Sequence, residues 1–348
     1  SFNDLTDTAA AIKQLDLVIT IDTVIAHLAG ALGKPVWVML NFDSDWRWLT
    51  DRKDSPWYPT MRLFRQAKIG DWHSIIKQIK NSLIDLVENA AHVEKKSRII
   101  SLKLPESGVK KALGKYTSNK LKKTVNNYSK LLQTALEKYK AGNFEEAEQI
   151  CHLIIQDKPD IAGAFEILGL CAQKTDKTNL VITYCQKAIS LNPNNEQTYL
   201  NLAIALKNQH KFNAAIIHNQ KALSRKPNYA EAWHNLGQIF KGKGEITESI
   251  RCYQKALSIR PNYIDAHFGF SLIFLKQGDF IQGFSEYEWR CKRQDYETRS
   301  FGQPVWDGSN FPGKTLFIYT EQGLGDSIQF IRYIPLVKKL GGRVIVEC

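Results

Sequence analysis

The sequence lacks any run of apolar residues near the roughly 20 that a helix needs to cross a bilayer, so no membrane span is predicted. It also lacks a C-x-x-C pair among its six cysteines, and neither a metal site nor a redox motif is indicated. Such cysteines commonly pack as small apolar side chains in a reducing compartment. We therefore expect a cytoplasmic protein that needs no metal and no cofactor. The cysteines are Cys151, Cys171, Cys185, Cys252, Cys291 and Cys348.

Positive charge is concentrated in one short part of the chain. Of the net charge of +12, residues 91–131 hold +9, from 11 Lys and Arg against 2 Asp and Glu. A nucleic-acid site would gather basic residues on one face and interleave them with stacking aromatics, and this segment does neither. We interpret residues 91–127 as a solvated basic linker and expect no nucleic-acid partner. An RNA-binding or membrane-surface patch is the alternative.

Four prolines mark an internal repeat. Pro159, Pro193, Pro227 and Pro261 are each 34 residues apart, and columns of aromatic, leucine and alanine residues align with them. The period and these columns resemble the tetratricopeptide repeat, in which each unit is a pair of amphipathic helices. A single unit cannot bury its apolar face, so several units stack into a solenoid. We expect repeats over residues 128–294, with four full units and a fifth that caps them.

Two asparagines, Asn201 and Asn235, occupy one column on the first helix of their units. In the repeats of O-GlcNAc transferase, which this array resembles, asparagines in that column bind the backbone of an extended peptide. An amide offers the donor and the acceptor that a peptide group needs. The resemblance therefore predicts a peptide or protein partner, although Ile167 and Gly269 interrupt the column here. The alternative is that the two asparagines only solvate the surface.

The N-terminal flank reads as part of a parallel sheet. Residues 17–21 are strand-like, residues 24–32 have helical spacing, and the strand 36–40 follows Pro35. Asp22 and Thr23 lie between the first strand and the helix, where parallel sheets bind ligands. The free N–H groups of a helix N-terminus suit phosphate.

These residues resemble the nucleotide-sugar half of heptosyltransferase-like glycosyltransferases, which have two facing Rossmann domains. Their DT-x3-H signature is matched by Asp22, Thr23 and His27. The resemblance implies that Thr23 and His27 contact the diphosphate of a nucleotide sugar and that Asp22 orients the loop. The alternative is that Asp22 and Thr23 cap the helix and His27 packs in the core. We expect residues 1–90 to be the end of such a domain. For residues 46–57 we favour packing, with Trp46, Trp48 and Trp57 fixing a long loop to the core. The alternative is that Arg47 and Arg52 reach a phosphate or the acceptor.

The C-terminal flank reads as strand 315–319, glycine loop, helix 326–340 and strand 343–346. The string GLGDSIQFIRYIP resembles the first turn of the acceptor half of the same glycosyltransferases. The resemblance implies Asp326 as the general base and Gly323 and Gly325 as nucleotide-sugar contacts, with Gln322 and Gln329 as weaker candidates. Asp326 as an ordinary helix residue is the alternative. Residues 295–348 would be the truncated start of that domain.

The order of the two flanks is opposite to that of the resembled enzymes. We therefore expect a segment of a longer tandem protein, with residues 1–90 and 300–348 in different active sites. A circular permutation is the alternative. The fold expected is an α-solenoid flanked by partial Rossmann-like segments of GT-B type. The leading function is that of a glycosyltransferase fragment, inactive alone, that transfers a sugar to a protein or glycan hydroxyl. The alternative is a non-catalytic scaffold for protein–protein interaction.

Overall fold

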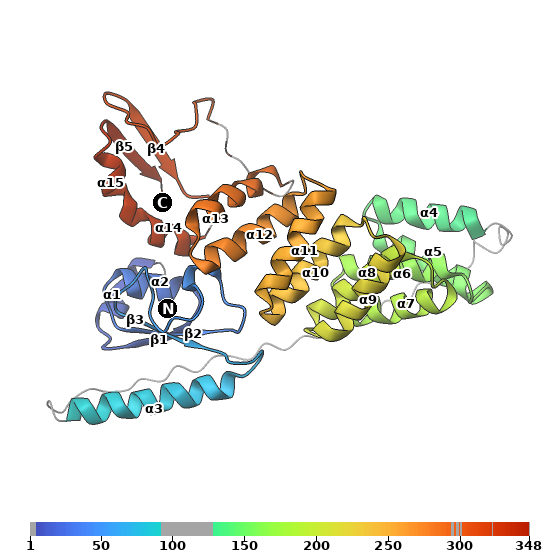
Figure 1. Ribbon diagram of the computed structural model, residues 1–348, viewed down its shortest axis with the longest axis horizontal. Coiled ribbons are helices and arrows are strands. Elements are labelled where there is room, and N and C mark those ends of the chain that lie inside the picture. Colours follow the sequence, from blue (N-terminus) through green and yellow to red (C-terminus); the bar gives the residue numbers. More distant parts are fainter. Residues whose placement is uncertain are drawn as a thin grey trace. The chain divides into compact units, whose positions relative to one another are not determined.

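The computed structural model describes residues 5–91, 128–293, 296, 299, 301–321 and 323–347. All of the expected linker except residue 91 therefore lies outside the described residues. The chain divides into two compact units (Figure 1). The repeat unit comprises Arg98–Ser271 and Glu286–Arg290. The α/β unit comprises Ser1–Ser97, Leu272–Ser285 and Cys291–Cys348.

The repeat unit is a stack of antiparallel helix pairs, as the 34-residue period predicts. Within each pair the two helices are joined by a short turn, and the proline columns fall between pairs, where a missing N–H ends the second helix. The pairs are α4 (Tyr128–Lys140) with α5 (Phe144–Asp157), α6 (Ala162–Lys174) with α7 (Thr178–Leu191), α8 (Glu196–Asn208) with α9 (Phe212–Arg225), and α10 (Ala230–Lys243) with α11 (Ile246–Ile259). A fifth pair, α12 (Ile264–Gln277) and α13 (Phe280–Tyr287), has residues in both units.

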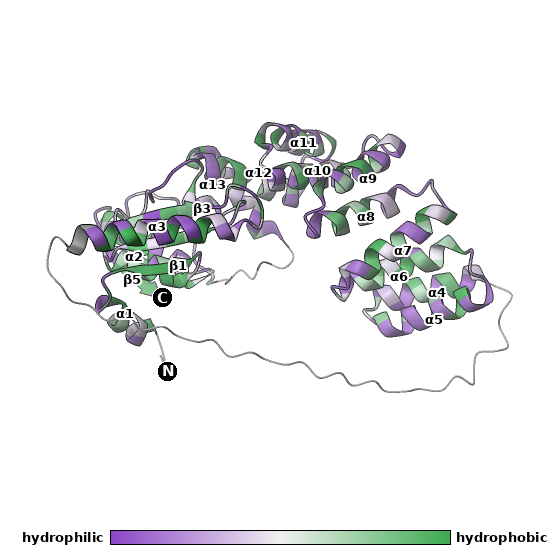
Figure 2. Cartoon of the chain, turned by 90° about the horizontal axis from the view of Figure 1, so that it is seen from below, coloured by the Kyte–Doolittle hydropathy of each residue, from purple (hydrophilic) through white to green (hydrophobic). Residues whose placement is uncertain are grey.

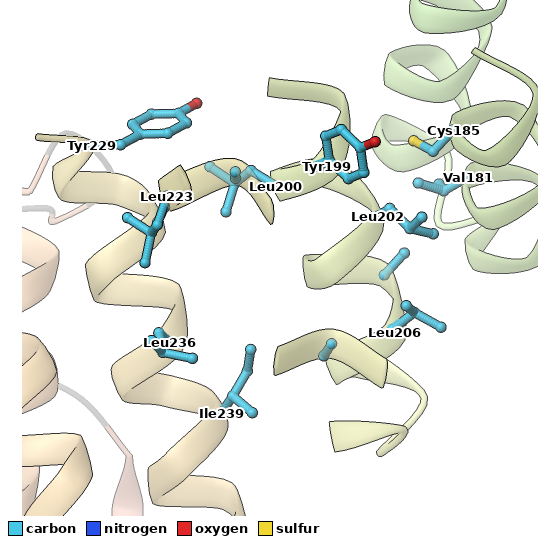
Figure 3. Packing of buried hydrophobic residues seen from close by; sticks show 14 of the residues in the cluster. Val181, Cys185, Tyr199, Leu200, Leu202, Leu206, Leu223, Tyr229, Leu236 and Ile239 are labelled. Atoms are coloured by element: carbon cyan, nitrogen blue, oxygen red, sulfur yellow. The ribbon is translucent and has the colours of Figure 1, made fainter. Parts of the chain in front are cut away.

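The stack is held together by a continuous apolar core. Leu202 and Ile239 are fully buried, and Leu206 and Leu236 pack in the same cluster (Figure 3). The aligned alanines Ala188, Ala222 and Ala256 have no exposed surface, because larger side chains there would separate the crossing helices. Figure 2 shows hydrophilic and hydrophobic residues alternating around these helices, as expected of amphipathic helices.

The turn inside each pair has one residue with positive φ. That position is glycine in three pairs, Gly142, Gly244 and Gly278, whereas Asp176 (φ 54°) and His210 (φ 57°) hold it in the other two. Glycine adopts this left-handed conformation at little cost, but other residues do so less readily. The turn of the α6–α7 pair therefore carries a strained aspartate.

The α/β unit begins with a three-stranded parallel sheet. The strands β1 (Val18–Ile21), β2 (Val36–Leu40) and β3 (Met61–Arg65) lie in the order β1-β2-β3, with Val18 opposite Val36 and Val36 opposite Met61. Helix α2 (Val24–Ala31) connects β1 to β2, as predicted. The remaining elements are α1 (Leu5–Lys13), the short 3-10 helix η1 (Trp46–Trp48) and α3 (Trp72–Ala91).

The strand β3 was missed in the sequence, because two arginines interrupt its apolar residues. Arg65 is held inside the unit, where it donates to the Ser44 hydroxyl at 2.9 Å and to backbone carbonyls. Arg62 lies over the ring of Phe64, 4.8 Å from its centre. Trp46 and Trp48 are buried, in agreement with the packing interpretation of this stretch.

The second part of the α/β unit is a parallel pair of strands, β4 (Thr315–Tyr319) and β5 (Arg343–Glu347). The sequence predicted one helix between them, but three short elements are found: α14 (Leu324–Phe330), η3 (Ile331–Tyr333) and α15 (Ile334–Lys338). Pro335 explains the break, because it has no N–H to continue the helical ladder from α14. Among the described residues, none of the helices has the length and apolar character that a bilayer crossing demands.

Candidate functional site

The two predicted peptide-binding asparagines have different surroundings. Asn235 is 3% exposed, and its Nδ2 donates to Oδ1 of Asn219 at 2.9 Å. Asn219, fully buried on α9, donates in turn to the carbonyl of Ala232 at 2.9 Å. Asn235 therefore belongs to a buried amide pair between α9 and α10, and its donor is already used within the protein.

Asn201 is accessible from solvent. Its Oδ1 accepts a hydrogen bond from Nε2 of Gln197 at 2.9 Å, one turn earlier on α8. The Oε1 atom of Gln197 accepts from the Tyr229 hydroxyl, which fixes the glutamine. Asn201 also lines an open hollow between α6, the start of α7 and α8. Of the two asparagines, this one is positioned to meet a ligand.

A polar network on α8 and α10 was not found by sequence reasoning. Lys207 Nζ donates to Oε1 of Gln238 at 2.5 Å, and Gln238 also contacts the ring of His234. Burial of its amine, together with the charge of Lys241, lowers the pKa of Lys207 to about 8. Burial lowers the pKa of His234 to about 4. The repeat period could have indicated this network, because Lys207 and Lys241 are 34 residues apart and so hold equivalent positions in successive repeats.

In the α/β unit, His27 lies in a buried aromatic pocket. Its Nδ1 is 3.2 Å from the Tyr58 hydroxyl, and its ring stacks on Trp48 with centres 5.2 Å apart. Burial, assisted by the nearby charge of Arg47, lowers the pKa of His27 to about 4. The imidazole is therefore neutral near pH 7. A Cβ at Gly325 of α14 would lie 3.0 Å from this ring, so a glycine allows the close approach of α14.

Two of the predicted carboxylates meet at this pocket. The Asp326 carboxylate is 2.5 Å from Arg47 Nη2, while Nη1 of the same arginine is 2.8 Å from Asp45. Burial raises the pKa of Asp326, and Arg47 counteracts this rise. Asp22 as a whole residue is exposed, yet its carboxyl group is partly buried. This burial raises the pKa of Asp22, while an interaction with Trp48 lowers it by a smaller amount.

The assignment of residues 1–90 and 300–348 to different active sites stays a prediction, but the structure brings residues of both flanks together. Asp22, His27, Gly325 and Asp326 lie in one compact unit. Helix α14 packs against α2, although the two are far apart in sequence, and Gly325 of α14 lies against the ring of His27 of α2. The cluster presents two carboxylates, an arginine and a neutral imidazole to the same region.

The other predicted residues of this unit have simpler surroundings. Thr23 precedes α2 with extended backbone and makes no side-chain cap, since its Oγ1 is directed to the carbonyl of Ile21 at 3.4 Å. Gly323 precedes α14 with φ 55°, a conformation that favours glycine. Gln329 is fully buried, and its amide makes no hydrogen bond. Gln322 lies outside the described residues.

Within the part of the chain that the structure describes, no group of three or more His, Cys, Asp or Glu side chains is arranged to hold a metal ion. Four of the cysteines, Cys151, Cys171, Cys185 and Cys252, are buried free thiols. Burial raises the pKa of Cys151, Cys185 and Cys252 to about 12, so these thiols are protonated and unreactive near pH 7.

The buried imidazole of His27 predicts a pH-dependent stability. As the pH falls below 6.5, the unfolded chain protonates this histidine before the folded chain does, so the folded state loses stability down to about pH 4. Between pH 6.5 and 5 the loss from this group is about 2 kcal/mol. His27→Gln should remove that part of the pH dependence in urea unfolding followed by tryptophan fluorescence. A slope equal to that of the unaltered protein would show that folding does not shift the pKa of His27. His234, whose pKa burial also lowers to about 4, allows the same comparison in the repeat unit through His234→Gln.

Comparisons with known proteins agree with the repeat unit. Two family models of the tetratricopeptide repeat match residues 184–217 and residues 230–263. A curated relative, Protein FlbA of Caulobacter vibrioides, is 37% identical over 82 residues, a stretch that spans 24% of this chain and 13% of that protein. Among solved structures, MamA is 23% identical and covers 45% of this chain and 92% of its own, with a TM-score of 0.41. PilF of Pseudomonas aeruginosa is 17% identical and covers 47% of this chain and 75% of its own, with a TM-score of 0.43. The chain contains tetratricopeptide repeats suited to protein–protein interaction.

Proposed function

We propose that the chain is a non-catalytic scaffold whose repeats bind an extended segment of a partner protein. The observation that carries this proposal is the hollow beside Asn201, which combines a buried apolar floor with an accessible amide. A peptide offers both an apolar side chain and backbone groups for such a place. Asn235 contributes to the stability of the stack instead, through its pairing with Asn219.

The proposal is tested by selecting 12-residue peptides from a randomised library on the full chain and measuring their affinity by fluorescence anisotropy. Asn201→Ala should weaken binding about tenfold, the loss of one or two good hydrogen bonds, without changing the melting temperature. Thr183→Ala, an exposed position on α7, is the matched control and should bind normally. If no peptide is enriched, or if both variants bind alike, the scaffold proposal is wrong.

A second candidate function is glycosyl transfer, for which the support is the cluster of Asp22, His27 and Asp326. In this proposal Asp326 accepts the proton of an acceptor hydroxyl while the oxygen attacks the sugar carbon. The nucleoside diphosphate leaves, stabilised by the loop of Thr23 and His27. Asp326 would first have to leave its ion pair with Arg47, because a carboxylate held by a guanidinium is a weak base.

This second candidate makes a separate prediction. Nucleotide sugars should bind the full chain in isothermal titration calorimetry, and His27→Gln should weaken that binding. Asp326→Ala should abolish transfer while donor binding persists. Unchanged turnover would remove Asp326 as the base, and absence of donor binding would remove the candidate altogether.

A further inference from the structure

The hollow beside Asn201 has an apolar floor and an oxygen-rich rim. Ala172, Val181 and Ala205 on the floor are buried, and Ile204 packs beside them. Gln173, Asp176, Thr178, Asn201 and Asn208 complete the lining. A single carboxylate, that of Asp176, is the only formal charge among these lining residues. The hollow therefore suits a side chain with an apolar stem and a positively charged end.

Asp176 lies at this rim because it belongs to the turn between α6 and α7. Asp176 holds the positive-φ position that glycine holds in three other pairs. Its N–H donates to the carbonyl of Gln173, and Thr178 then begins α7. The turn thus fixes the backbone of Asp176 at the edge of the hollow, and the residue is exposed to solvent.

We infer that this hollow binds a lysine side chain in the partner's extended segment. The inference rests on the scaffold proposal and specifies its ligand. Lysine has a four-carbon stem that fits the floor of Ala172, Val181 and Ala205, and an ammonium group with three donors. The acceptors around it are the Asp176 carboxylate, the amide oxygens of the rim and the hydroxyl of Thr178.

The occupant's charge follows from the lining. An acidic side chain would be repelled by Asp176, and no lining residue would neutralise it. A purely aliphatic side chain would cover the floor but would take rim oxygens away from water without pairing them, which is unfavourable. Asn201, whose Oδ1 is occupied by Gln197, can direct its Nδ2 to a backbone carbonyl of the same segment.

The test combines one change in the peptide with one change in the protein. In the peptide with the highest affinity from the library, each lysine is replaced by norleucine, which keeps the stem and removes the charge. In the full-length chain, Asp176→Asn removes the carboxylate, and asparagine tolerates positive φ. Asp160→Asn, in an exposed turn outside the hollow, removes the same charge as the matched control.

We expect one norleucine replacement to weaken binding about tenfold on the unaltered protein but less than twofold on Asp176→Asn. Asp160→Asn should retain the full lysine preference. If every norleucine peptide binds within twofold of its parent, or if the two aspartate variants behave alike, the lysine site is wrong. Peptides that still depend on Asn201 in that case would leave the scaffold proposal intact, whereas failure to select any peptide would remove both.

Discussion

Replacing Gly269 by asparagine, the residue found at the same repeat position in Asn201 and Asn235, should destabilise the stack rather than extend the asparagine column. A Cβ at Gly269 would lie 2.8 Å from Cζ of Tyr253, a distance that real contacts do not adopt. Tyr253 is fully buried, so its ring cannot move aside directly into solvent. Overpacking together with a buried amide should lower the free energy of unfolding by about 3 kcal/mol.

A double variant tests whether the Tyr253 ring causes this loss of stability. One 34-residue repeat earlier, the positions of Tyr253 and Gly269 are held by Asn219 and Asn235, which hydrogen-bond to each other. The double variant Tyr253→Asn with Gly269→Asn copies that pair and should recover part of the lost stability in urea unfolding. No recovery, or a stable single Gly269→Asn variant, would show that the tyrosine ring does not set this position.

Replacing Asn235 by alanine should cost about 3 kcal/mol of unfolding free energy. The change removes a buried hydrogen bond and leaves the fully buried Asn219 Oδ1 without its donor. Asn201→Ala, in the same column but accessible to solvent, should cost less than about 0.5 kcal/mol. The measurement is urea unfolding followed by circular dichroism at 222 nm. Equal losses of unfolding free energy in the two variants would contradict the distinction between a buried Asn235 and an accessible Asn201.

The chain contains its own control for this pair. Cys151 and Ile167 occupy the two corresponding positions nearer the start of the stack. Both are buried in one apolar cluster there. The double variant Asn219→Cys with Asn235→Ile should therefore be more stable than Asn235→Ala, because it leaves no buried polar atom without a partner. A double variant as unstable as the single one would mean that packing, and not the hydrogen bond, dominates.

The helix pairs were predictable from the sequence because every period repeats the same contacts over a short sequence separation. The burial of Asn235 was not predictable, because it depends on a hydrogen bond to Asn219 of the preceding helix pair. No sequence pattern marks Asn219. Reading the column 151, 185, 219, 253 beside the column 167, 201, 235, 269 would have suggested the pairing. The break at Gly269 has the same explanation, since Tyr253 fills the space.

The α/β unit was predicted only in pieces. Strand β1, helix α2 and strand β2 follow from local apolar patterns, whereas β3 was hidden by Arg62 and Arg65. The contact of Gly325 with His27 and the ion pair of Asp326 with Arg47 join residues about 280 to 300 positions apart. No local pattern encodes such contacts, so the sequence indicated the candidate residues without showing that they would meet.

The most direct test of the scaffold account is site-specific photo-cross-linking of a selected peptide to the full chain. Benzoylphenylalanine is placed at Asn208, which lines the hollow on α8, or at Asn213, an exposed position on α9 outside it. The account predicts efficient cross-linking from position 208 and only background from position 213, with the excess removed by unlabelled peptide. Cross-linking that is equal at the two positions, or stronger at 213, would contradict it.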